Sequence, residues 1–408
     1  MSTQKKNALI CDDDEDRIKI WKKHVENGLG RDDWSVSTMS SRDLAEAVNA
    51  LTHLEQNSKE NLQAPLTDSQ TIQIENFNSA SLVILDSDLT PHAQDIARWG
   101  EQGKDISHTL RNRTGDVMAR LIRTHTGAGY IVVVNRFSRS RYFDLTMMQA
   151  AAMHADLHIS GSELEVAALW TGNADNDPYN PWHWPILRQA QEVVMAVEPR
   201  IDLPAKVLDT LGLHQDQFAA RQLDIFGKVK PAEATFQDLA DSSLGFGLPN
   251  PGRSDEEIRR MAASVIRRWL EKTVVAAQNV VTDLPHLITR FPVVLGEGSE
   301  NVMTLAWSTN KSNRPDESRL DLIAEAKSQV VSDFIGRPVY GVEAIRRLLP
   351  NLPKADPDLH NLVFAEDTSD FVLEETAQQF TTDLPGTYTH RYIREVPGVS
   401  YEPVVRRL

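Results

Sequence analysis

Two short apolar runs in the N-terminal part of the chain constrain the fold most, because each ends abruptly on aspartate. Asn7–Cys11 stops at Asp12 and Asp13, and Ser81–Leu85 stops at Asp86. A short apolar run that is cut off by acidic residues is typical of a buried parallel strand reaching the carboxyl edge of its sheet. We therefore predict two buried strands whose ends carry these aspartates.

The neighbouring segments alternate between strand and helix periodicity. Further strands are predicted at 34–38, 130–134 and 157–159, and amphipathic helices at 18–25, 44–54, 117–122, 145–152 and from 164 onward. Such alternation predicts a parallel sheet covered by helices on both faces. The expected fold class is α/β: a flavodoxin-like, doubly wound sheet of five parallel strands in the order 2-1-3-4-5.

Two stretches are longer than a minimal unit of this kind needs. Residues 57–78 are polar, and residues 89–113 carry charges with little periodicity. Long segments of this type inside a compact domain are usually lids or other insertions. We expect the second to overhang the carboxyl end of a central strand, where open α/β sheets place their ligands.

The strand-end aspartates could form a cation-binding site if the first and third strands are neighbours. Asp12, Asp13 and Asp86 would then converge, and carboxylates so close together need a cation. Hard oxygen ligands select Mg²⁺ or a similar ion, which can neutralise charge during phosphoryl transfer to a carboxylate nucleophile. Each aspartate alone is better explained as a helix cap or a solvated side chain, but the combination favours a site.

Four segments together resemble response-regulator receiver domains. Leu9–Asp16 and Leu82–Asp86 look like the family's first and third strands, Gly115–Arg123 its third helix, and Ala155–Ile159 its fifth strand. The resemblance spans about residues 5–170, less than half of the chain. It implies phosphorelay signalling in a two-component system, with a histidine kinase or another signalling protein as partner.

The resemblance also assigns roles to the aspartates. It implies that Asp86 is the phosphoacceptor, that Asp12 and Asp13 hold Mg²⁺ together with Asp86, and that the backbone carbonyl of Asp88 is a further ligand. A phosphoryl group on Asp86 would add about two negative charges and bias a bistable face of the domain.

Two positions depart from the family's pattern. Asn135 stands where receivers carry Ser or Thr after the fourth strand, and Ser160 stands where they carry Lys after the fifth. That Lys is a point charge on the phosphoryl oxygens, so its loss removes a main stabiliser of the phosphorylated state. The arginines that could replace it are Arg98, Arg111, Arg113, Arg136 and Arg139. The other interpretation is a pseudo-receiver that binds its partner by shape and is never phosphorylated.

Two further motifs point to enzymes. Asp86–Thr90 has the DxDxT pattern of haloacid-dehalogenase-like phosphatases, but that family opens with the motif, whereas two βα units precede it here. Asp316 followed by Glu325 and Lys327 resembles the PD-ExK pattern of nucleases. Such a site needs strand geometry, and the spacing instead predicts a helix to about Phe334 with Glu325 and Lys327 on its solvent side.

The rest of the chain is divided into a linker and helical region, 171–253, and an α-rich α+β output region, 254–408. A Pro-bracketed aromatic cluster at Trp182–Trp184 is expected to pin the linker onto a core. Ser254 and Glu257 form a capping box that begins the clearest helix. Its rim carries Arg259, Arg260, Arg267 and Arg268, which we expect to be a solvated face rather than a contact with phosphates or with the aspartate cluster. The tail from Tyr388 to Leu408 is expected to pair as a β element.

Composition excludes several classes of protein. One cysteine among 408 residues makes neither an internal disulfide nor a cysteine-rich zinc site. No apolar run approaches the ~20 residues of a membrane helix. A net charge of -15 argues against broad nucleic-acid binding, although a local basic patch stays open.

We therefore expect a soluble, cytoplasmic, prokaryotic signalling protein: an atypical receiver, phosphorylated or degenerate, coupled to an output region of unknown role. We expect a regulator rather than an enzyme. The alternatives are a metal-dependent phosphohydrolase or nuclease, and a non-catalytic adaptor in a defence or stress complex. A homodimer also stays open.

Overall fold

The structure is a computed structural model of the chain. It describes all residues except 1–4, 31, 61–64, 92–95, 98, 100–101, 136–139, 146–153, 173–176, 243–253, 296–320, 352–360, 382–389 and 403–408. Within the described part, no helix has the length and apolar composition that crossing a bilayer requires.

A sheet of five parallel strands forms the N-terminal part of the molecule. Its order is β2-β1-β3-β4-β6. The strands are β1 (Lys6–Cys11), β2 (Trp34–Met39), β3 (Leu82–Asp86), β4 (Tyr130–Asn135) and β6 (Leu157–Ser160). Because β6 is the fifth strand of the prediction, the predicted order and the flavodoxin-like α/β fold class are confirmed.

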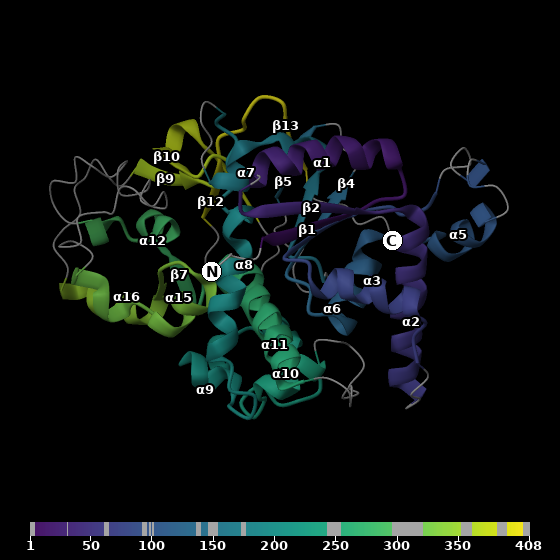
Figure 1. The fold of residues 1–408 in the computed structure, drawn as a ribbon. Helices are drawn as coiled ribbons and strands as arrows, with labels where there is room; N and C mark the ends of the chain where they lie inside the picture. Colours follow the sequence, from purple (N-terminus) through teal and green to yellow (C-terminus); the bar gives the residue numbers. More distant parts are fainter. Residues whose placement is uncertain are drawn as a thin grey trace.

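Helices cover both faces of this sheet (Figure 1). They are α1 (Glu15–Leu29), α2 (Ser41–Glu60), α3 (Asp68–Asn78), α5 (Gln102–Leu110), α6 (Gly115–His125), η1 (Gly161–Glu165) and α7 (Ala167–Thr171). Side chains of α1 and α7 pack with one set of alternate strand residues, and those of α2, α3 and α6 pack with the other set. The chain thus buries both faces, as the fully apolar strands require.

The two long segments contain helices. In 57–78, α2 continues to Glu60 and α3 begins after its N-cap, Thr67, so the predicted insertion includes a helix. In 89–113, α5 forms, and the backbone N–H of Leu89 donates to the carbonyl of Arg113 at 3.0 Å, which closes the segment at its base. Most of the helix predicted at 145–152 lies outside the described residues.

A small sheet joins the N-terminal region to the tail of the chain. Strand β5 (Arg141–Asp144) pairs in parallel with β13 (Val399–Glu402), so the tail does pair as a β element. A four-stranded sheet, β10-β9-β12-β11, and a two-stranded sheet, β7-β8, also belong to the C-terminal region. Their strands are β7 (Val281–Asp283), β8 (Val339–Gly341), β9 (Leu362–Ala365), β10 (Asp370–Leu373), β11 (Gln378–Phe380) and β12 (Arg391–Ile393).

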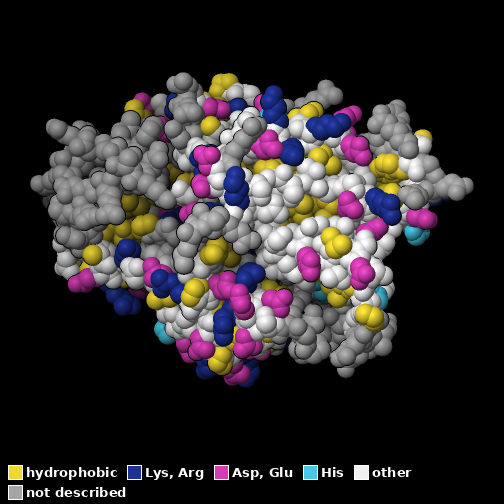
Figure 2. All heavy atoms as spheres, viewed as in Figure 1, with side chains coloured by type: hydrophobic (Ala, Val, Ile, Leu, Met, Phe, Trp, Pro, Cys, Tyr) yellow, Lys and Arg dark blue, Asp and Glu magenta, His cyan; other side chains and the backbone are white. Residues whose placement is uncertain are grey.

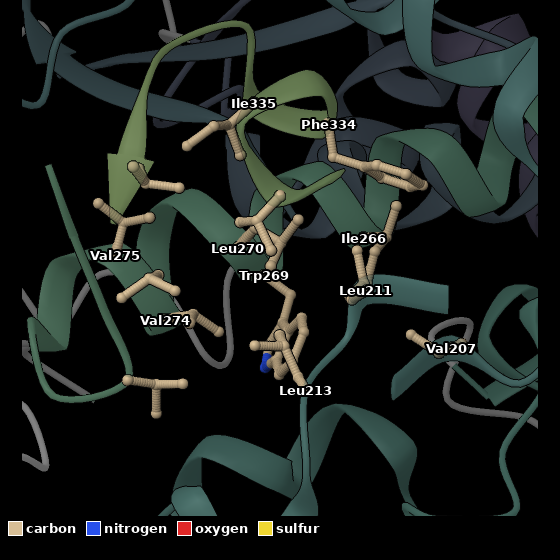
Figure 3. Packing of buried hydrophobic residues seen from close by; sticks show 14 of the residues in the cluster. Val207, Leu211, Leu213, Ile266, Trp269, Leu270, Val274, Val275, Phe334 and Ile335 are labelled. Carbon is tan, nitrogen blue, oxygen red and sulfur yellow. The ribbon is translucent and has the colours of Figure 1, made fainter. Parts of the chain in front are cut away.

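Helices dominate the rest of the C-terminal region. They are α8 (Leu187–Val197), η2 (Glu198–Arg200), α9 (Val207–Leu211), η3 (Gln215–Gln217), η4 (Ala220–Phe226), α10 (Phe236–Ser242), α11 (Asp255–Trp269), η5 (Leu270–Val275), α12 (Leu284–Arg290), η6 (Pro292–Leu295), η8 (Asp321–Ala326), α15 (Gln329–Ile335), α16 (Val342–Leu348), η9 (Leu349–Asn351) and η11 (Glu374–Thr376). The capping box of Ser254 and Glu257 starts α11 as predicted. Figure 3 shows Trp269, the last residue of α11, in the largest core cluster, to which Leu270 of η5 and Leu211 and Leu213 also belong.

The rim of α11 differs from the prediction at one arginine. Arg267 is 2% exposed, so the expected solvated face was wrong at this position. Its guanidinium lies 4.9 Å from the ring centroid of Tyr130, and Nη2 lies 3.5 Å from Oδ1 of Asp156. Tyr130 starts β4 and Asp156 precedes β6, so α11 docks at the amino edge of the sheet, opposite the aspartate cluster. On the face shown in Figure 2, described acidic and basic side chains are interspersed.

Candidate functional site: an acidic pocket at the carboxyl edge of the sheet

Three aspartates meet where β1 and β3 end. The two strands are neighbours, with Cys11 opposite Leu85, so the residues that follow them emerge side by side. Asp12, Asp13 and Asp86 are 0%, 1% and 0% exposed, and one carboxylate oxygen of each lies within 4.8 Å of the others. The predicted convergence of these side chains is therefore present in the fold.

An arginine that sequence reasoning missed lies in this pocket. Nε of Arg17 donates to Oδ2 of Asp12 at 2.5 Å, and Nη2 donates to Oδ1 of the same carboxylate at 2.8 Å. Nη2 also lies 3.4 Å from Oδ1 of Asp13 and 3.4 Å from Oδ2 of Asp86. The guanidinium thus holds one carboxylate at two points and approaches both others, which is the geometry in which Arg binds carboxylates best.

The charges in the pocket raise the pKa of Arg17. Burial alone would lower this pKa, but the hydrogen bond and charge of Asp12, together with Asp86 and Asp13, outweigh burial. The guanidinium therefore stays charged at any pH at which the protein is folded. One positive charge faces three carboxylates, so these four groups together keep the capacity to attract a further cation.

Local structure explains how Arg17 reaches the pocket. Asp14 caps α1 by accepting hydrogen bonds from the backbone N–H groups of Asp16 and Arg17. Its own backbone N–H donates to Oδ1 of Asp12 at 2.9 Å, which orients that carboxylate. Arg17 therefore lies in the first turn of α1, directly above the end of β1. In the sequence, its contact with the aspartates could have been inferred only from spacing, because Arg17 follows Asp13 by four residues and Asp12 by five.

Asn135 and Ser160 lie at the same edge of the sheet. They end β4 and β6 and are opposite each other in the register. Asn135 is exposed, whereas Ser160 is buried, with its backbone N–H donating to Oε2 of Glu163 at 2.6 Å. The hydroxyl of Ser160 lies 2.9 Å from that of Ser162. The position at which receivers carry Lys is thus a short hydroxyl that bonds within its own loop.

Asp88 follows the pocket in a turn of its own. Its Oδ1 accepts a hydrogen bond from the backbone N–H of Thr90 at 3.0 Å. The group of three converging carboxylates does not include it. Its backbone carbonyl as a metal ligand stays a prediction.

The arginines proposed to replace the missing Lys have varied positions. Arg98, Arg136 and Arg139 lie outside the described residues. Arg111 is exposed, and Nε of Arg113 donates to the carbonyl of Thr109 at 3.4 Å. The structure instead brings Arg17 to the aspartates.

The end of β3 is packed tightly against the start of α6. The backbone N–H of Gly115 donates to the carbonyl of Ser87 at 3.0 Å. A Cβ at Gly115 would lie 2.5 Å from the carbonyl oxygen of Asp86, so only glycine permits this approach. Beneath the pocket, burial and then the charge of Asp12 raise the pKa of Cys11, which makes this thiol a poor nucleophile.

The nuclease-like motif does not form one helix. The 3₁₀ helix η8 ends at Ala326, Lys327 forms a β-bridge with Tyr340, and α15 begins only at Gln329. The prediction of a continuous helix to Phe334 was therefore wrong. Glu325 and Lys327 are exposed, as predicted. Asp316 lies outside the described residues.

Comparisons with known proteins do not assign the chain to a family. No protein-family model matches it, and no solved structure matches it significantly. The chemistry of the pocket must therefore be argued from its own geometry.

Proposed function

We propose that the chain is an atypical signalling protein of the response-regulator type, in which Asp86 accepts a phosphoryl group. The observation that supports this most is the convergence of three buried carboxylates at the carboxyl edge of a 2-1-3-4-6 parallel sheet. Open α/β sheets bind their ligands at this edge, beside the switch point between β1 and β3.

The donor set fits Mg²⁺. Asp12, Asp13 and Asp86 supply three carboxylate oxygens from two strand ends, and Mg²⁺ prefers few carboxylates together with water and phosphoryl oxygens. When bound, the ion would neutralise negative charge on the phosphoryl group. In the transfer itself, a carboxylate oxygen of Asp86 forms a bond to phosphorus. The bond from phosphorus to the donor's leaving atom breaks, and that atom keeps the electron pair; it is an imidazole nitrogen for a phosphohistidine donor and an oxygen for acetyl phosphate.

Arg17 takes the part of the missing lysine in this proposal. Its Nη2 lies 3.4 Å from Oδ2 of Asp86, close enough to contact phosphoryl oxygens attached there. Arg is always charged and binds phosphate at two points, so it can replace a Lys as an electrostatic stabiliser. Its two hydrogen bonds to Asp12 also mean that Mg²⁺ and the guanidinium compete for that carboxylate.

Two contacts could carry a change at Asp86 to the C-terminal region. Arg267 of α11 reaches Asp156 beside β6, and β13 pairs with β5. We propose that a histidine kinase or another signalling protein acts on the pocket and that the C-terminal region responds through these contacts.

The test uses acetyl phosphate and Mg²⁺, followed by intact-mass measurement of the full chain. The wild type should gain one phosphate, Asp86→Ala should gain none, and Asp88→Ala should gain it like the wild type, because Asp88 lies outside the triad. No gain in the wild type, or an equal gain in Asp86→Ala, would overturn the proposal. Continuous release of inorganic phosphate, or cleavage of DNA, would replace it with a phosphohydrolase or a nuclease.

A further inference from the structure

A second, separate cavity lies where β5, the aromatic segment Trp182–Pro185, η5 and the segment between α15 and β8 meet. Its volume is about 60 Å³, and its lining includes Asp144, His183, Lys272 and Arg337. A buried water needs roughly 10–15 Å³ on this measure, so the cavity has room for several waters or one small oxyanion. Asp144 ends β5, and Lys272 lies on η5, a π-helical turn that continues α11. Such turns are frequent at functional sites.

Nitrogen donors of this lining lack protein acceptors. Nδ1 of His183 and Nε of Arg337 are buried and have no hydrogen-bond partner among the described residues. The ammonium of Lys272 also lines the cavity; the charges of Glu271 and Asp156 act on it, and Glu271 itself forms its ion pair with Arg267. Buried donors are nearly always satisfied in native proteins, because leaving one unmet is costly. Two such groups around one cavity, with the ammonium of Lys272 beside them, indicate a missing acceptor.

Two cationic side chains, Lys272 and Arg337, and two carboxylates, Asp144 and Glu271, line the cavity. The pKa of His183 is lowered to about 3, first by burial and then by the charge of Lys272. Glu366 acts in the opposite direction, and Arg391 and Arg337 lower the pKa further. Glu271 also lines the cavity, but Oε2 of this residue pairs with Nη1 of Arg267 at 2.9 Å, which offsets its charge. The imidazole is therefore neutral, and its surroundings favour an anion.

The carboxylate of Asp144 favours a bound anion that carries a proton. A fully ionised oxyanion such as sulfate would meet this carboxylate with like charge and no proton to donate. A phosphate group that carries one proton can instead donate its O–H to a carboxylate while its other oxygens accept from cationic donors. The mixture of donors and one carboxylate thus fits hydrogen phosphate better than sulfate or a simple carboxylate.

We propose that this cavity binds a hydrogen phosphate group, as inorganic phosphate or as the terminal group of a small phosphomonoester. Lys272, Arg337 and Nδ1–H of His183 donate to its oxygens, and Asp144 accepts its proton. The site is distinct from the acidic pocket and does not depend on phosphoryl transfer to Asp86. Because Asp144 belongs to β5 and Lys272 to η5, the ligand joins the two regions of the chain.

Calorimetric titration of the full chain tests the site, with inorganic phosphate, O-phosphoserine and sulfate as separate probes. Phosphate should bind, and Lys272→Met should weaken it about tenfold or more, as expected for one charge-assisted contact. Sulfate should bind at least about tenfold more weakly than phosphate, and Asp144→Asn should reduce that preference. Tighter binding of O-phosphoserine, with the same dependence on Lys272, would identify a phosphomonoester as the ligand.

Matched variants keep the result interpretable. Lys230→Met removes an exposed lysine that pairs locally with Glu233, and it should bind phosphate like the wild type. Asp86→Ala should also bind normally, which separates this site from the acidic pocket. Circular dichroism confirms that each variant is folded. No binding of phosphate or O-phosphoserine to the wild type, unchanged affinity in folded Lys272→Met, or sulfate binding as tight as phosphate would overturn the proposal.

Discussion

Replacing Arg17 by methionine tests whether its guanidinium balances the acidic pocket. The substitution keeps most of the side chain's apolar stem but removes the charge that contacts Asp12, Asp13 and Asp86. The three carboxylates, all buried, then face one another without this cation. We expect a marked loss of stability near neutral pH, because a buried charge without its partner is unfavourable.

The structure sets the size of this loss. At 3.4 Å, the distance from Nη2 to Asp86, two charges attract by about 5 kcal/mol at an effective dielectric constant near 20. Desolvation offsets much of this attraction, and removing one partner of a buried pair costs about 3–5 kcal/mol. The side chain of Arg17 is 16% exposed, so water relieves part of the loss, and we expect about 3 kcal/mol. For a domain of this size, the melting temperature should fall by roughly 6–12 °C.

Urea unfolding with EDTA and with Mg²⁺ measures both the loss and its rescue. Lys19→Met is the control, because Lys19 lies on the same helix with a side chain 72% exposed and should change stability by less than about 0.5 kcal/mol. In Arg17→Met the pocket is open to the metal, and Mg²⁺ at a hundredfold excess over its Kd should restore about 2.7 kcal/mol. The wild type should gain less, because there the metal must displace the guanidinium.

If Arg17→Met is no less stable than Lys19→Met, the three carboxylates do not need the guanidinium, which contradicts this prediction. The prediction also fails if Mg²⁺ stabilises both variants equally, because the pocket would then not be the site at which the ion acts.

Two further predictions concern packing and pH. Gly115→Ala should destabilise the fold by about 1–3 kcal/mol, because its Cβ would lie 2.5 Å from the carbonyl oxygen of Asp86 at the end of β3. Gly161→Ala is the control and should have little effect, because a Cβ there would have no atom within 4 Å. Equal melting temperatures of the two variants would contradict this prediction. Burial would raise the pKa values of Asp283 and Glu366. The charge of His286 lowers the pKa of Asp283 to about 2, and the charge of Arg391 and the hydrogen bond from His286 lower the pKa of Glu366 to about 2. Their contribution to stability is therefore complete above pH 4.5, the ordinary pKa of Glu366, and is lost as pH falls toward 2. Burial would lower the pKa of His286, but Asp283 and Glu366 raise it. Its contribution to stability is therefore complete below pH 6.5 and is lost as pH rises through the raised pKa. A free energy of unfolding that stays constant from pH 4.5 to 2 would contradict the prediction for Asp283 and Glu366.

The parts of the fold that could be predicted from the sequence are those whose patterns are local. Strands β1 and β3 contain apolar runs that stop at aspartate, and their order follows from alternation with helices. Helix α3 was missed because its buried positions are Gln73, Ile74 and Phe77, too few and too polar to give a clear apolar face.

The missed contacts involve charged or distant residues. Arg17 lies beside the apolar face of α1, and hydrophobic periodicity does not show which neighbour a charge will meet. Arg267 was assigned to a solvated rim for the same reason, yet it is buried against Tyr130. The pairing of β5 with β13 joins segments far apart in the sequence and depends on tertiary packing rather than on local propensity.

Locating the phosphoryl group in the sequence tests directly whether Asp86 is the phosphoacceptor. After treatment with acetyl phosphate and Mg²⁺, borohydride reduction converts an aspartyl phosphate to homoserine, which peptide mass spectrometry can place in the sequence. We expect homoserine at Asp86, the buried end of β3, and none at Asp12, Asp13 or Asp88. Homoserine at another aspartate, or at none, would contradict the assignment of this pocket as a phosphoacceptor site.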